Sequence, residues 1–164
     1  MKIRSIGFFF LAAVTAALVG CGGGGGGGEA PPVQPTRAIV KLATSGTLPA
    51  GTLIGGIGTT TVTYPTTKGL SITDSNVVTS GVGISAGSFL IPNLTIPGQA
   101  KFIMANVQPG IAAGEFATLT FSIASGNSPV AGDFVITEGA TPVLDTNSVA
   151  ISGVSVIIQS VTFQ

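Results

Sequence analysis

The sequence predicts an all-β fold, a β-sandwich that follows an N-terminal export segment. Short segments rich in Val, Ile, Thr and Phe recur along the chain from residue 36 onward. Clusters of Pro, Gly, Asn and Asp separate these segments at intervals typical of turns between strands. No stretch in this region keeps the 3.6-residue apolar period of an amphipathic helix. Several short strands joined by regular turns favour two packed sheets.

The first two strands are expected at residues 37–43 and 57–64. The first is a compact apolar run that opens the domain. The second alternates, and alternate residues of a strand face opposite sides of a sheet. We therefore expect Thr60, Val62 and Tyr64 on the core side. The opposite face carries three threonines, Thr59, Thr61 and Thr63.

The remaining strands follow in order to the end of the chain. Residues 116–124 alternate most cleanly, with Leu119 and Phe121 predicted in the core and Thr120 outside. The last segment is long and β-branched, and Gly153 within it predicts a bulge or bend. The expected segments after the second are 77–91 in shorter pieces, 100–107, 116–124, 133–137 and 149–163.

The N-terminus has the layout of a secretory signal. Lys2 and Arg4 precede an apolar stretch at residues 6–19, which is short for a membrane span of about 20 residues. The run from Leu18 to Cys21 resembles the lipobox of bacterial lipoproteins. That resemblance implies cleavage before Cys21 and lipidation of its sulfur. Cys21 is the only cysteine, so lipidation would also use a thiol that has no disulfide partner in the chain.

Three regions follow from this layout: a signal peptide at residues 1–20, a lipidated Cys with a Gly/Pro-rich linker at 21–35, and a β-sandwich domain at 36–164. The linker begins with an unbroken glycine run and continues into prolines, so it is expected to act as a tether. The lipoprotein resemblance implies a bacterial cell envelope location. Because Gly22, not Asp, follows the Cys, the outer membrane or cell surface is favoured.

Composition excludes several classes of function. After removal of residues 1–20 the chain keeps four basic and six acidic residues, a net charge of about −2. A chain without a basic patch is not expected to bind nucleic acid. There is no His, which removes the commonest catalytic base and metal ligand. We therefore expect no enzyme activity, no cofactor and no metal centre.

Four segments in order give the domain a further resemblance. Residues 114–123 read Gly-Glu-Phe-Ala-Thr-Leu-Thr-Phe-Ser-Ile, which resembles a strand signature of cohesin domains. Residues 58–65, 101–106 and 131–136 resemble neighbouring strands of that family and occur in the same order. The resemblance covers residues 36–164 and implies a jelly-roll sandwich of about nine strands. It also implies binding of a dockerin-like protein through one sheet face.

One departure bears on the partner. The family's Asp between Tyr and Pro has no counterpart, because Tyr64 is followed directly by Pro65. We expect a lipid-anchored module for protein–protein or cell-surface attachment, with Thr59, Thr61 and Thr63 as the candidate binding face. Two alternatives stay open: a structural surface lipoprotein that self-assembles, and a weak carbohydrate-binding module.

A few other polar residues could in principle carry chemistry. Glu115 and Asp133 lie at predicted strand ends and are more simply read as solvated charges. Asp74 and Asp145 each precede hydroxyl and amide residues that could bind Ca²⁺, although turns stabilised by Asx hydrogen bonds explain both. Tyr64, the only Tyr, is expected to pack in the core.

Overall fold

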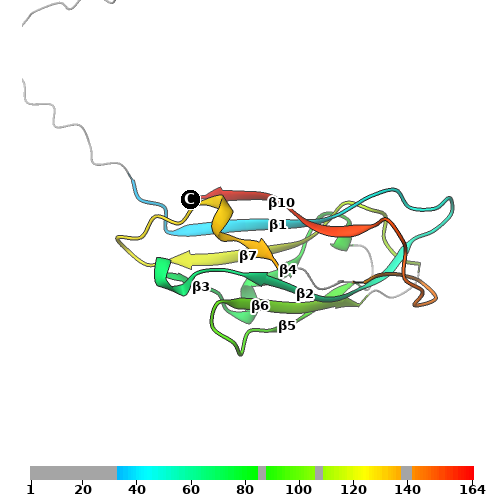
Figure 1. The fold of residues 1–164 in the computed structure, drawn as a ribbon, viewed down its shortest axis with the longest axis horizontal. Helices are drawn as coiled ribbons and strands as arrows, with labels where there is room; N and C mark the ends of the chain where they lie inside the picture. The colour runs from blue at the N-terminus through cyan, green and yellow to red at the C-terminus, as the bar shows by residue number, and fades with distance from the viewer. Residues whose placement is uncertain (1–32, 85–87, 106–108, 138–141) are drawn as a thin grey trace, which may run out of the picture. The chain divides into compact units, whose positions relative to one another are not determined.

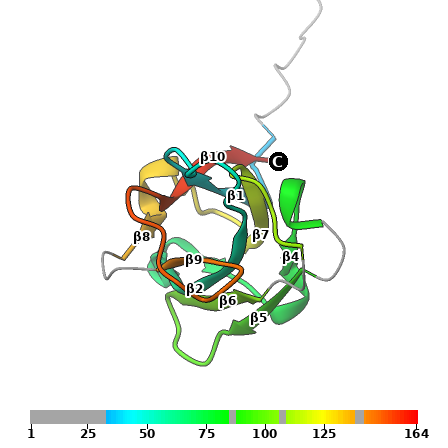
Figure 2. The same ribbon diagram turned by 90° about the vertical axis from the view of Figure 1, so that its right-hand side faces the viewer.

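The computed structural model describes residues 33–84, 88–105, 109–137 and 142–164. Within the compact unit Val33–Gln164, two antiparallel sheets of five strands each pack face to face. Figures 1 and 2 show these two layers from the side and from one end. The predicted β-sandwich is therefore confirmed. The described residues form no α-helix, only four short 3₁₀ segments, η1 Thr66–Lys68, η2 Asp74–Asn76, η3 Gly81–Ile84 and η4 Ala131–Asp133.

The first sheet has the strand order β10-β1-β7, with two short strands beyond β7. Its members are β10 Ser155–Phe163, β1 Arg37–Ser45, β7 Glu115–Ile123, β3 Leu70–Ser71 and β4 Val77–Thr79. Both β3 and β4 pair with the same edge of β7, at opposite ends of that strand. Their two short ladders together fill one strand position.

The second sheet has the order β5-β6-β2, again with two short strands at its far edge. Its members are β5 Phe89–Asn93, β6 Gln99–Ala105, β2 Ile54–Thr63, β8 Val135–Ile136 and β9 Val143–Asp145. β8 pairs with the end of β2 and β9 with its start. The ten observed strands thus fill eight strand positions. The expected count of about nine strands lies between these two numbers.

The core lies between the inner faces of the two sheets. The strand alternation predicted in residues 116–124 is confirmed from Ala117 to Ile123, where Leu119 and Phe121 are fully buried and Thr120 is not. It breaks at Phe116, which is fully buried next to the buried Ala117, beside the register shift between Leu42 and Ala43. Thr60, Val62 and Tyr64 are also buried, as predicted for the second strand. The largest fully buried side chains come from both sheets and include Phe102, Phe116 and Phe121.

Strand boundaries differ from the prediction where the chain lacks an alternating pattern. The second strand starts earlier than predicted, at Ile54, and its first part is rich in glycine. Gly55 lies so close to the Asp145 backbone that a side chain at position 55 would collide with the Asp145 carbonyl oxygen. The last strand starts only at Ser155, because Gly153 is in a turn with a φ of 76°. The predicted signal peptide, Cys21 and residues 21–32 of the linker lie outside the described residues.

Candidate functional site

The three threonines of the candidate face lie on β2, at the centre of the second sheet. Thr59 is exposed, whereas Thr61 and Thr63 are half-buried. The Thr63 hydroxyl donates a hydrogen bond to the Val135 carbonyl on β8, at 3.1 Å. β2 is flanked by β6 on one side and by β8 and β9 on the other. The outward threonines are therefore held on a rigid sheet, not on a loop.

Apolar side chains lie on the same sheet face, on β5 and β6. Phe89 and Ile91 are each 47 % exposed and Ile103 is 38 % exposed. Ile91 lies directly opposite Ile103 in the register of the two strands. Such neighbours contact one another on one face of a sheet. The prediction from sequence found the threonines but missed this apolar group, although the alternation of residues 89–93 could have indicated it.

A polar row runs beside the apolar pair. Asn93 lies opposite Lys101, and Lys101 lies opposite Thr61. The Asn93 side-chain oxygen accepts a hydrogen bond from the Thr95 hydroxyl at 2.8 Å. The face therefore combines an apolar centre with hydroxyl, amide and ammonium groups along one side.

A hollow of about 490 Å³ lies at this place. Its lining is supplied by β2, by the β5–β6 hairpin and by η2. The lining residues are Thr59, Asp74, Ile91, Pro92, Asn93, Leu94, Thr95, Lys101, Phe102 and Ile103. Its volume is of the size that holds a small ligand or a few side chains.

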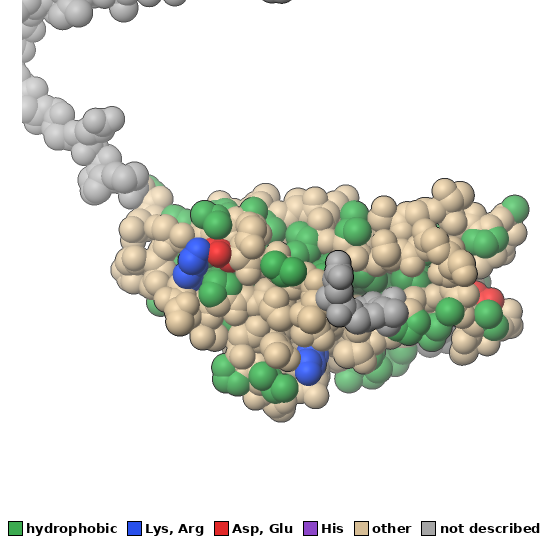
Figure 3. Space-filling view, in the orientation of Figure 1, with side chains coloured by type: hydrophobic (Ala, Val, Ile, Leu, Met, Phe, Trp, Pro, Cys, Tyr) green, Lys and Arg blue, Asp and Glu red, His purple; other side chains and the backbone are tan. Residues whose placement is uncertain are grey.

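Charges are sparse over the described domain, and the view in Figure 3 shows few charged groups among tan and green surface. Two ion pairs join the described residues, Lys41–Glu115 at 3.0 Å and Lys68–Asp133 at 2.7 Å. None of these four residues lines the hollow. Lys101 and Asp74 line the hollow, and neither takes part in an ion pair with a described residue.

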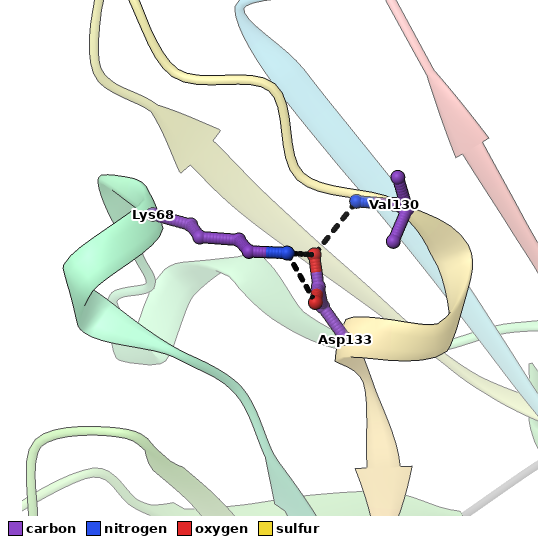
Figure 4. Close-up of polar contacts among 3 residues, drawn as sticks. All are labelled: Lys68, Val130 and Asp133. Carbon is purple, nitrogen blue, oxygen red and sulfur yellow. Dashed lines mark hydrogen bonds and ion pairs between the residues drawn. The ribbon is translucent and has the colours of Figure 1, made fainter.

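Asp133 holds a turn and an ion pair at once. Its carboxylate accepts hydrogen bonds from the Lys68 ammonium and from the backbone N–H of Val130, as Figure 4 shows. Only 14 % of its side chain is exposed. The Lys68 ammonium, and then the Val130 N–H, lower the pKa of Asp133 below its ordinary value. Asp133 is thus a structural link between η1 and η4, not merely a solvated charge.

Glu115 is a second such link, at the start of β7. Its pKa is lowered first by the Ser80 hydroxyl and then by Lys41 on β1. The Ser80 hydroxyl is buried without a hydrogen bond of standard geometry, yet it lies close enough to stabilise the ionised carboxylate. The expectation of a simply solvated turn position is corrected here, because the sheet pairing brings Lys41 against Glu115.

The two candidate Ca²⁺ positions differ in what their carboxylates do. The Asp145 carboxylate accepts N–H bonds from Asn147 and Val149, both at 2.8 Å, as in an Asx turn. Asp74 starts η2 and lines the hollow. Within residues 33–84, 88–105, 109–137 and 142–164, no three His, Cys, Asp or Glu side chains come together as a metal site.

Cys21 lies outside the described residues, so its lipidation stays a prediction. In the part of the chain that the structure describes, no helix is long and apolar enough to cross a membrane.

Compared with protein-family models, curated proteins and solved structures, the chain matches none of them.

Proposed function

We propose that the protein is a non-catalytic, lipid-anchored binding module. It takes a protein partner on the outer face of the β5–β6–β2 sheet. The observation that carries this proposal is the hollow lined by the exposed apolar side chains of Ile91 and Ile103 and by Thr59. On the same sheet face, Phe89 is exposed farther along β5, and Thr61 lies opposite Lys101. Exposed apolar groups gathered on one face and rimmed by polar residues are typical of interaction surfaces.

The strand order supports a jelly-roll, cohesin-like domain. The chain changes sheet at most connections, and only β3–β4, β5–β6 and β8–β9 connect strands of the same sheet. Jelly rolls are double-sheet folds in which the chain winds between two antiparallel layers. The cohesin resemblance favours a protein partner bound by a sheet face, with a dockerin-like protein as the expected example. The missing Asp before Pro65 favours a partner that differs from the family's usual one.

The chemistry of the face favours a largely uncharged contact. Its centre is apolar and its rim carries hydroxyls. Among the described residues that line the hollow, only Lys101 and Asp74 are charged, and their charges have opposite signs. Affinity would come mainly from apolar burial, at roughly 25 cal/mol per Å², and only weakly from charge attraction. Binding should therefore change little with salt, because there is little electrostatic attraction to screen.

The predicted lipid anchor on Cys21 would determine where in the cell the protein lies. A diacylglycerol on Cys21 and an acylated amine would hold the chain on a bacterial envelope membrane, because stable anchoring takes at least two acyl chains. The 14 residues from Gly22 to Pro35 reach roughly 46 Å when fully extended. The domain would thus be held off the membrane, at the outer membrane or cell surface, where its sheet face meets partners.

Carbohydrate binding is a weaker candidate for the same hollow. Sugar sites commonly stack rings on exposed aromatic side chains, whereas the chain has no Trp and its single Tyr64 is buried. Phe89 is the one exposed aromatic on this sheet face among the described residues. A titration with envelope polysaccharides therefore serves as the comparison for the protein-binding test.

The test compares two matched substitutions. Envelope and secreted proteins are captured with the soluble chain that begins at Gly22, and the captured partner is titrated against each variant. Thr61→Lys places an unpaired charge on the proposed face and should weaken binding at least tenfold. Thr120→Lys, on the outer face of the other sheet, should bind as the wild type does. Equal binding by both folded variants would show that the β5–β6–β2 face is not the site.

A further inference from the structure

The strand β10 forms a long sheet edge. It pairs with β1 on one side, and no strand of the described residues pairs with its other side. Arg37 and Gln164 exchange both backbone hydrogen bonds, at 2.9 Å each. Antiparallel pairs alternate, so within each regular stretch of β10 the backbone N–H of every second residue points away from β1. η4 and β8 approach β10 but do not extend its sheet.

The inner side of β10 is incompletely covered. Val161 lies opposite Val40 in the register, and Ile158 lies opposite Leu42. Val40 and Leu42 are fully buried, whereas Val161 and Ile158 are only partly buried against the same core. Val156 and Phe163 are partly buried in the same way. The side of the sandwich along β10 therefore leaves core-facing apolar surface accessible.

Natural sheet edges are usually protected by charge, proline, shortness or a β-bulge. The other edges described here have such protection: β5 contains Pro92, and β3, β4, β8 and β9 have two or three residues each. β10 has nine residues, with no charged residue and no proline. The register shift between Lys41 and Leu42 leaves one extra residue, Gln159, in β10, and this bulge divides the strand into two regular halves of four residues each, 155–158 and 160–163. Edge pairing would use one of these regular halves.

We propose that β10 pairs antiparallel with β10 of a second copy of this chain, so that the first sheet continues across the pair. Such a pairing is self-complementary, since a twofold axis places the same strand on both sides. With no charge in β10, no like charges face each other across the contact. The second strand would cover the partly buried Ile158 and Val161. This contact is separate from the proposed binding face, which lies on the other sheet.

Confinement to a membrane favours this contact if Cys21 is lipidated. Copies anchored in one surface meet at a much higher effective concentration than free copies do. The self-assembling surface lipoprotein considered from the sequence would then have a defined joining element, the β10 edge. The pairing itself depends only on the domain and can be tested with or without the anchor.

The test is a cysteine scan in the full chain, expressed in cells and oxidised mildly. Single cysteines replace the exposed β10 residues Ser155, Ile157, Gln159 and Thr162, with Asn93→Cys on β5 as the control. Only a residue next to the twofold axis meets its own copy, because residues two positions away are about 14 Å from theirs. We expect one β10 position to give at least fivefold more dimer than the others and than Asn93→Cys.

Three outcomes would overturn the proposal. Equal yields at all positions would indicate random collisions, no dimer at any β10 position would exclude pairing, and cross-links to another protein would show a different occupant. The unsubstituted chain, with Cys21 alone, gives the background.

A second measurement uses charge instead of cysteine. Sedimentation of the full chain in detergent should show a dimer that Ile157→Lys weakens at least tenfold, because each copy then places an ammonium group, with no acidic partner in β10, in an otherwise uncharged contact. Val78→Lys, a comparably exposed position at the other edge of the same sheet, should leave the dimer unchanged. If Ile157→Lys dimerises like the wild type while remaining folded by circular dichroism, the β10 edge is not the contact.

Discussion

The ring of Tyr64 lies edge-on to the ring of Phe121, with 4.9 Å between ring centroids and an interplanar angle of 64°. Phe121 contacts Phe134 at the same centroid distance. Tyr64 follows the last residue of β2, whereas Phe121 lies on β7 of the other sheet. This aromatic cluster therefore joins the two sheets across the core, and tilted ring pairs add to the stabilisation from burial.

Replacing Phe121 with Ala should be among the most destabilising single changes. It removes a fully buried ring and leaves a cavity between the sheets, at a cost of roughly 3–5 kcal/mol. Thr120→Ala, the matched control on the outer face of the same strand, should cost about 1 kcal/mol or less. Urea unfolding of both variants measures the difference, and similar midpoints would contradict the assignment of the strand's inner and outer faces.

The Lys68–Asp133 pair predicts a loss of stability in acid. The pKa of Asp133 is lowered in the fold, so the unfolded chain binds protons more readily. The contribution of Asp133 is therefore fully present above the carboxyl's ordinary pKa of about 4 and is lost as the pH falls through the lower, folded value. The effect should be modest, because Lys68 is substantially exposed and solvent weakens the pair.

Lys68→Met tests this assignment. The variant should be slightly less stable than the wild type at pH 7 and should lose less stability between pH 5 and pH 2, since the ammonium that lowers the pKa of Asp133 is gone. Lys101→Met, a lysine without an ion pair to a described residue, serves as the control. Thermal melts across this pH range give the comparison, and identical acid profiles for wild type and Lys68→Met would refute the role of the pair.

Gly46 should not tolerate a side chain. Its φ is 121°, and a Cβ there would lie 2.1 Å from the Gly153 carbonyl oxygen. Gly51 also has a positive φ, but a Cβ there would meet no heavy atom within 4 Å. Gly51→Ala should therefore cost about 1–2 kcal/mol from backbone conformation alone, and Gly46→Ala should cost clearly more. Equal denaturation midpoints for the two variants would show that the close approach of residues 46 and 153 is absent in solution.

Lipidation is the remaining prediction. Cys21→Ala should abolish incorporation of labelled fatty acid and should block normal cleavage of the signal segment, because the acceptor sulfur is gone. Membrane fractionation and mass spectrometry of the N-terminus measure both effects. A Cys21→Ala protein that is still cut at the same bond and still sediments with membranes would rule out the lipoprotein assignment.

The strands that sequence predicts best are those whose two faces meet different surroundings. β7 is an example, because from Ala117 to Ile123 its inner residues meet the core while Thr118, Thr120 and Ser122 lie on the other face, and this produces alternation. The short strands β3 and β9 were not predicted from the sequence. With two and three residues they carry no period, and they exist because β7 and β2 offer them a pairing edge.

The candidate site was predictable only in part for a related reason. Thr59, Thr61 and Thr63 lie on one strand, so their common face follows from spacing alone. The apolar group with Ile91 and Ile103 depends on the register between β5 and β6, which a single sequence does not specify. The ion pairs of Lys41 and Lys68 join residues 74 and 65 positions apart, so only the fold brings them together.

The backbone bonds between Arg37 and Gln164 place the start of the first strand and the end of the last at one end of the sandwich, as Figure 1 shows. The opposite end carries the turns at residues 46–53 and 146–154. The chain therefore enters the domain at the end that carries Arg37 and Gln164, and the far turns lie at the end away from this entry. A fusion added after Gln164 would emerge beside the start of β1, whereas a peptide inserted at Gly51 would be presented at the opposite end of the domain.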